Sequence, residues 1–289
     1  MLRRCILLAI AVVAVILLSA FWPRKSAFPP LPEPNGYDVL VRAAAKVVRS
    51  EKSLKEMTTN ELAAVVATNR VALAELRRAL QLPATVPVKM DMDWIAAQAT
   101  NMSKLKEAAW VMRMEVLYQQ RRGEIDPALD ESFDLLHLGE SVWRGGVLIN
   151  MLFGTACEAI AVHCMTNLLP SLSSGQCKRL AAELDRREVR RESFDEIMGR
   201  EKEWQRQTFG LLVRLEQAFT EDILRQKPFD AEKEYHTRVL EVRRLMLAAA
   251  SRAFELEKGR KPQRVAELVP LYLRALPTDP ATGAALELP

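Results

Sequence analysis

Residues 142–169, VWRGGVLINMLFGTACEAIAVHCMTNLL, form a long apolar segment that is followed directly by Pro170. As a helix, this segment would be apolar on almost every face, which is typical of a helix buried on all sides. Its apolar part, residues 145–169, carries the polar side chains of Asn150, His163 and Asn167 and a single formal charge, Glu158. These residues favour a buried helix in a soluble domain over a membrane span. We therefore expect this segment to be the central helix of an all-α fold.

The segments on either side have the pattern of amphipathic helices. Only 11 of the 289 residues are glycine and 49% are hydrophobic, in a chain rich in helix-forming residues. Apolar residues recur at spacings of three and four. The expected helices cover approximately residues 37–55, 58–82, 91–123, 126–138, 142–169, 174–219 and 235–253. This pattern predicts an irregular helical bundle over residues 37–258.

Local signals support several of these helices. Thr58 and Glu61 have the spacing of a capping box, and a serine at 173 or 174 can cap another helix. Acidic and basic residues alternate densely over residues 178–203, which is typical of a solvated helix face. The expected ion pairs there are Glu183 with Arg187 and Glu196 with Arg200.

The N-terminal segment is the second long apolar stretch. Residues 5–22 contain no charge, and as a helix they would be about 27 Å long, close to the thickness of a hydrocarbon core. A cleaved signal peptide usually has a shorter apolar region and small residues at its cleavage site. We therefore favour an uncleaved anchor over residues 1–25, with membrane lipid as its partner. The proline-rich residues 26–36 would then form a linker.

The net charge of +4 has a local source. Four basic residues flank the apolar N-terminal stretch: Arg3, Arg4, Arg24 and Lys25. Without them, the rest of the chain carries equal numbers of basic and acidic residues. Nucleic-acid binding needs a concentration of basic residues, so we do not expect a nucleic-acid partner.

The sequence CEAIAVHC, residues 157–164, is the strongest candidate for chemistry. A metal site on one helix needs ligands at spacings of three or four. Cys157 and Cys164 face the same way, but Glu158 and His163 each project about 100° from their neighbour. We therefore treat Cys157 and Cys164 as weak metal candidates and expect no cofactor.

Glu158 and His163 are weak catalytic candidates. A buried Glu158 would need a partner or a raised pKa, and such residues cluster at functional sites. We favour the alternative, that Glu158 pairs with an arginine of another helix or lies at an exposed edge. Asn150 and His163 are expected to be satisfied polar groups of the core.

Three cysteines lie in the body of the chain. Cys157 and Cys164 are about 10.5 Å apart along a helix, too far for a disulfide. Cys177 could reach one of them after the turn at Pro170. The odd count and the helical core favour buried free thiols.

The last 31 residues differ from the rest, because prolines and glycines become frequent. Gly259 is placed to end a helix, and Pro262 prevents its continuation. Asp279, Pro280 and Gly283 suit a type I turn. Residues 259–289 are therefore expected to form a short, turn-rich cap.

This tail resembles the segment that follows the second helix in major pseudopilins of type II secretion. The resemblance lies in the order and spacing of matching residues: Gly259, Arg260, Pro262, Leu268, Val269, Pro270, Tyr272, Leu273, Leu276, Pro277, Asp279, Pro280 and Gly283. It implies a structural tail of an assembly subunit. The N-terminus, however, has neither a prepilin cleavage site nor an early glutamate in its apolar stretch, and only six residues follow Gly283.

The chain also resembles membrane-anchored helical proteins of planctomycete-type bacteria. Leu148–Ile149, the apolar helix over residues 156–161, and Leu172–Ser173 carry this likeness together with the tail. It implies an all-α envelope protein and no particular activity.

From these observations we expect a non-catalytic scaffold or protein-interaction module with one protein partner or more. It would be held in the bacterial inner membrane by a single span, with its C-terminal domain extracytoplasmic. Two alternatives stay open. One is a pseudopilin-like subunit of a secretion or assembly system, and the other is an enzyme with a site near Glu158 and His163.

Overall fold

The computed structural model describes residues 27–50, 52–220 and 230–288, and these residues form an all-α bundle. The expected membrane span, residues 5–22, lies outside the described residues. Eight helices are described: α2 (Gly36–Ala44), α3 (Thr59–Leu80), α4 (Asp93–Arg121), α5 (Ile125–Trp143), α6 (Leu148–Leu168), α7 (Ser174–Glu188), α8 (Phe194–Thr220) and α9 (Ala231–Lys258). Three short 3₁₀ helices accompany them: η1 (Leu54–Glu56), η2 (Leu169–Ser171) and η3 (Val265–Leu268).

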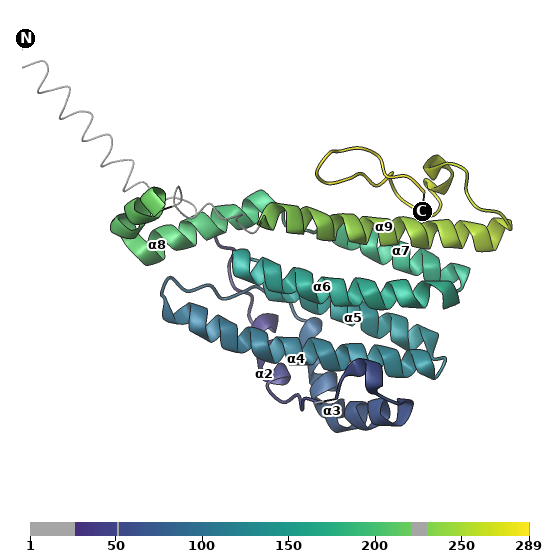
Figure 1. Cartoon of the computed structure of the whole chain (residues 1–289), viewed down its shortest axis with the longest axis horizontal. Helices are drawn as coiled ribbons and strands as arrows, with labels where there is room; N and C mark the ends of the chain where they lie inside the picture. The colour runs from purple at the N-terminus through teal and green to yellow at the C-terminus, as the bar shows by residue number, and fades with distance from the viewer. Residues whose placement is uncertain (1–26, 51, 221–229, 289) are drawn as a thin grey trace, which may run out of the picture.

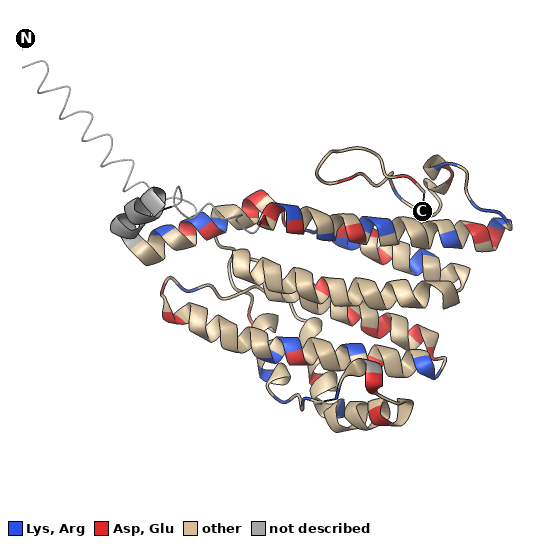
Figure 2. Cartoon of the chain, viewed as in Figure 1, with Lys and Arg blue, Asp and Glu red and all other residues tan. Residues whose placement is uncertain are grey.

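The helices stack roughly in chain order. Figure 1 shows α2 and α3 at one side, then α4, then α5 with α6, and finally α7 with α9 at the other side. The closest packing is within the pairs α5–α6 and α7–α9. α6 therefore lies in the middle of the stack, as its sequence predicts, and Figure 2 shows it almost free of charged residues.

α6 is the one described helix that is long and apolar enough to span a membrane by length and composition, when counted with η2 as Leu148–Ser171. Half of its most apolar window is buried inside the protein. A core helix passes the same test of length and composition, and the packing of α6 against α4, α5, α8 and α9 agrees with that role.

The expected helix over residues 142–169 begins later in the structure, as α6 at Leu148, and residues 142–143 belong to the end of α5. α5 ends at Trp143, and Gly145 has a φ of 69°, in the left-handed region that glycine enters without strain. The backbone groups freed by this break find partners: the Gly145 N–H donates to Glu192, and Arg200 Nε donates to the Gly146 carbonyl at 2.7 Å. The break therefore depends on side chains distant in the sequence.

The expected helix over residues 37–55 is also shorter, since α2 ends at Ala44. The side chain of Asn69 in α3 binds the extended backbone that follows. It accepts from the Val48 N–H at 2.7 Å and donates to the Val48 carbonyl at 3.1 Å. Asn69 thus stabilises a non-helical segment that the apolar spacing alone does not reveal.

The expected capping signals are present. Thr58 and Glu61 form a reciprocal capping box at the start of α3, and Ser173 caps α7 with Gln176.

The tail begins at Gly259, which ends α9 with a φ of 67°. Asp279 accepts the backbone N–H groups of Ala281 and Thr282, as expected for its turn. The tail lies along α9 (Figure 1), where the ring of Tyr272 packs against that of Phe254.

Candidate functional site

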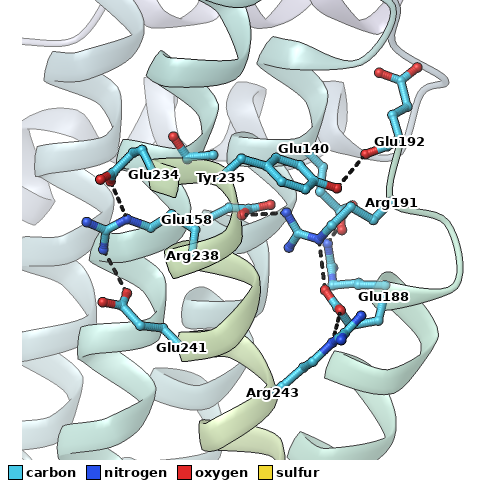
Figure 3. Close-up of polar contacts among 12 residues, drawn as sticks. Glu140, Glu158, Glu188, Arg191, Glu192, Glu234, Tyr235, Arg238, Glu241 and Arg243 are labelled. Atoms are coloured by element: carbon cyan, nitrogen blue, oxygen red, sulfur yellow. Dashed lines mark hydrogen bonds and ion pairs between the residues drawn. The ribbon is translucent and has the colours of Figure 1, made fainter. Parts of the chain in front are cut away.

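The candidate site is a buried network of charged side chains centred on Glu158, in the middle of α6. Glu158 is only 1% exposed, and its Oε2 accepts a hydrogen bond from Arg191 Nη1 at 3.0 Å. Arg191 lies in the turn between α7 and α8, and its side chain is 8% exposed. Its Nε donates to Glu188 Oε1 at 2.8 Å (Figure 3). Arg191 therefore bridges two carboxylates from different helices.

The network continues to α9 and to the tail. Arg243 Nε, from α9, donates to Glu188 Oε2 at 2.9 Å (Figure 3). Its Nη1 donates to the carbonyl of Thr278 at 2.6 Å. One chain of contacts thus joins α6, the end of α7, α9 and the C-terminal tail.

Two aromatic residues enclose Arg191. Its guanidinium lies 5.6 Å from the ring centroid of Trp143, a cation–π contact. The hydroxyl of Tyr235 donates to the backbone carbonyl of Glu192 at 2.8 Å, which fixes the turn that carries Arg191 (Figure 3). The arginine is therefore held in one position before any ligand is considered.

The electrostatics of the network are balanced. Glu158 and Glu188 carry two negative charges, and Arg191 and Arg243 carry two positive ones. Burial raises the pKa of Glu158, and the charge of Arg191 counteracts part of that rise. For Arg191, burial acts to lower the pKa, but Glu158 and Glu188 outweigh it and the pKa is raised. One oxygen, Glu158 Oε1, is buried without a hydrogen-bond partner.

Very little space remains beside Glu158. The cavity lined by Glu140, Trp143, Glu158 and Arg191 measures about 10 Å³, which is no more than a single water occupies. A wider cleft of about 450 Å³ opens between α9 and the tail turn, and three residues of the network, Glu188, Arg191 and Arg243, line it. The carboxylate of Glu158 does not line that cleft.

The structure does not bring the two catalytic candidates together. His163 is exposed, and its Nε2 lies 3.0 Å from Asn167 Nδ2. The expectation of a core histidine at position 163 is therefore wrong, since its face of α6 points to solvent while that of Glu158 points inward. Asn150 is fully buried as expected and accepts from the Val147 N–H, but its Nδ2 has no partner.

The three cysteines that the structure describes, Cys157, Cys164 and Cys177, are buried free thiols. Burial raises the pKa of Cys157 to about 12 and that of Cys164 to about 11. Both would therefore be protonated at neutral pH, in a form that binds metals poorly. Among the described residues, no group of three or more His, Cys, Asp or Glu side chains is placed to hold a metal ion.

Sequence reasoning missed the partners of Glu158, because residues 174–219 were expected to be one continuous helix. The chain turns at residues 189–193, where Ser193 and Glu196 form a capping box for α8. The spacing of Ser193 and Glu196 was the available signal.

The expected pair of Glu183 with Arg187 is present at 2.8 Å. The expected pair of Glu196 with Arg200 is replaced by Glu192 with Arg200 at 2.6 Å.

A second cluster of charges, without any sequence signal that we recognised, lies between α3, α4 and α5. Arg77 donates to Glu131 Oε2 at 2.7 Å and also binds Glu115, with Asp134 at 3.9 Å. Burial raises the pKa of Glu131 to about 8, and the neighbouring Glu115 adds to the rise. Glu131 Oε1 has no hydrogen-bond partner.

Fold and site together define an all-α bundle whose helices and tail are joined by buried ion pairs. Comparison with known proteins gave no match: no family model, no curated protein and no solved structure matches this chain.

Proposed function

We propose that the chain is a non-catalytic scaffold or protein-interaction module. One observation carries this proposal: the buried charges around Glu158 all pair with each other, and the cavity beside them measures about 10 Å³. A substrate could not reach the Glu158 carboxylate without breaking these pairs. The arrangement fits a role in holding helices and tail in fixed relative positions, as a binding platform requires.

The proposal places this platform at the bacterial inner membrane, outside the cytoplasm. Support comes from the sequence alone, from the uncharged residues 5–22 and the proline-rich residues 26–36. The tail, which Arg243 ties to the bundle, would then form part of the platform and not a separate arm.

Crosslinking in intact membranes tests the proposal. A tagged full-length chain should capture a reproducible set of partner proteins. A matched control carries residues 1–36 fused to an unrelated helical domain and should not capture that set. If both chains capture the same proteins, the body contributes no binding and the proposal fails.

A pseudopilin-like assembly subunit is the second candidate. The support for it is the tail, where Gly259 ends α9 and Asp279 accepts the backbone N–H groups of its turn, at positions that the resemblance includes. Such a subunit requires N-terminal processing, so the mass of the mature chain decides. An intact N-terminus would exclude this candidate.

A further inference from the structure

A basic groove lies far from the Glu158 network, between α4 and the segment that follows α2. We propose that this groove binds an extended acidic peptide segment of a partner protein. This inference rests on the proposed function as an interaction module and names the chemistry of the partner. The groove measures about 450 Å³, and its charged and aromatic lining consists of Arg49, Lys52, Lys106, Glu107, Trp110 and Arg113.

One wall of the groove is a stripe on α4. Lys106, Trp110 and Arg113 follow each other at spacings of four and three, so they lie on one face of the helix. Val111 and Met114, which are buried, add apolar surface beside them. A ligand in the groove would therefore meet two cations with aromatic and apolar surface between them.

Two of the four cations that line the groove are paired with acidic side chains of the protein. Arg49 lies 3.7 Å from Glu107, and Lys52 pairs with Glu61 at 2.6 Å. Within the described part of the chain, Lys106 and Arg113 form no ion pair with an acidic side chain. Since the rest of the chain beyond the N-terminal stretch is neutral overall, these two cations mark a local excess of positive charge.

Arg113 is also held in place. Its guanidinium lies 5.0 Å from the ring centroid of Trp110, and both side chains are half-buried. A cation stacked on an aromatic ring loses less side-chain freedom on binding, which strengthens the interaction. This geometry favours a carboxylate that approaches Arg113 from the open side of the groove.

The spacing of the cations indicates the form of the ligand. Lys106 and Arg113 are seven residues apart on α4, about 10.5 Å along the helix axis. In the extended polyproline II conformation, a peptide advances about 3.1 Å per residue with three residues per turn. Carboxylates three residues apart then lie on the same side, about 9.3 Å apart, and would match both cations. An apolar side chain between them would contact Trp110. A nucleic acid fits less well, because its affinity depends on neutralising many phosphates. In the described part of the groove, only Lys106 and Arg113 are cations without an ion pair.

Fluorescence anisotropy with the full-length chain in detergent tests this inference. The probe is the fluorescein-labelled peptide Gly-Ser-Glu-Leu-Ala-Glu-Gly-Ser, in which the two glutamates are three residues apart. Its control has glutamine at both positions. We expect the acidic peptide to bind at least about tenfold more tightly than the control, and rising salt to weaken its binding.

The double variant K106E/R113E should weaken binding of the acidic peptide by at least about tenfold. The matched control is Arg70→Glu, which reverses the charge of an exposed arginine on α3 that does not line the groove. Far-UV circular dichroism verifies that all variants are folded. If the acidic peptide does not bind, or binds the double variant as tightly as the wild type, the inference is wrong. Tighter binding of a single-stranded oligonucleotide than of the peptide would also overturn it, in favour of a nucleic-acid groove.

The crosslinking experiment separates this inference from the proposed function. If K106E/R113E still captures the same partner proteins as the wild type, the module stands and the groove is not its docking site. If every protein that the wild type captures is also captured by the membrane-anchored control, the proposed function itself fails.

Discussion

At the scale of single residues, Glu158 occupies an unfavourable position for a charged group. A carboxylate that is 1% exposed on an apolar helix is unfavourable unless a cation accompanies it. Arg191 is that cation, and Glu188 and Trp143 hold it in place. Removing Arg191 leaves the negative charge buried without compensation, whereas removing Glu158 leaves Arg191 with Glu188.

We therefore predict that Arg191→Ala lowers the free energy of unfolding by about 3–5 kcal/mol. Glu158→Gln should cost less. The measurement is urea unfolding followed by circular dichroism, and the matched control is the exposed neighbour Arg190→Ala, which should change stability by less than about 0.5 kcal/mol. Equal effects of the two arginine variants would show that the pair has no structural role.

The second cluster gives a prediction about pH. The folded-state pKa of Glu131 is raised to about 8 from an ordinary value of 4.5, so between these values the folded state binds more protons than the unfolded state. Stability from this group is fully present below about pH 4.5 and is lost as the pH rises toward 8. Glu131→Gln removes this titration.

The measurement is the free energy of unfolding of wild type and Glu131→Gln at pH 5, 6.5 and 8. Stability of the wild type should fall with rising pH relative to the variant. The difference between the two chains reports Glu131 together with its interaction with Glu115, and it cancels the titration of distant buried carboxyls such as Glu158. A wild type that gains stability relative to the variant over this range would contradict the raised pKa.

At the scale of helices, α5 and α6 approach each other closely at two glycines. A Cβ atom added to Gly154 would lie 2.7 Å from the Gly139 carbonyl oxygen and 2.9 Å from the ring of Trp143. Because the nearest obstacle is backbone, the helices would have to move apart. This contact also fixes the position of Glu158, whose side chain packs beside Gly139.

We predict that Gly154→Ala lowers the free energy of unfolding by about 1–3 kcal/mol. The control is Gly199→Ala in α8, where an added Cβ meets no atom within 4 Å. That exposed position should gain about 0.5–1 kcal/mol from the higher helix propensity of alanine. Thermal or urea unfolding measures both variants. If Gly154→Ala lowers the free energy of unfolding while Gly199→Ala raises it, the close approach of α5 and α6 is the cause.

The sequence predicts these helices better than it predicts their ends. The apolar pattern of α6 and the capping box at Thr58 depend on nearby residues, and both expectations are confirmed. The break at Gly145 and the end of α2 depend on Glu192, Arg200 and Asn69, which are distant in the sequence. The candidate site likewise could be predicted from nearby residues but not from distant ones. Glu158 stood out as a lone charge, but Arg191 could be assigned to it only once the turn between α7 and α8 was known.

At the scale of the whole molecule, charged residues have two roles: some form buried ion pairs, and others remain unpaired at the surface. The buried pairs join the bundle to its tail, while the groove on α4 keeps two cations unpaired among the described residues. Stability and the proposed binding therefore depend on different parts of the chain. Variants of the groove should weaken peptide binding and leave the free energy of unfolding unchanged, whereas variants of the Glu158 network should lower the free energy of unfolding.

Membrane attachment is the last prediction, and it rests on residues 5–22. Eighteen uncharged residues are enough to hold a helix in the hydrocarbon core. The full-length chain should therefore remain in the membrane pellet after alkaline extraction. A chain lacking residues 1–25 should be soluble and keep the circular dichroism of the helical bundle, because the described bundle begins beyond that point and includes its own core.

Two further measurements complete this test. Protease added to spheroplasts should digest the body, because an anchor whose N-terminus stays inside places the C-terminal domain outside the cytoplasm. The mass of the native protein should equal that of the whole chain. A soluble native protein that has lost its first residues would indicate a cleaved signal peptide, and a body protected from protease would reverse the orientation. The first result would remove the membrane from the proposed function, and the second would place the body on the cytoplasmic side of it. Both would leave the bundle and its groove as described.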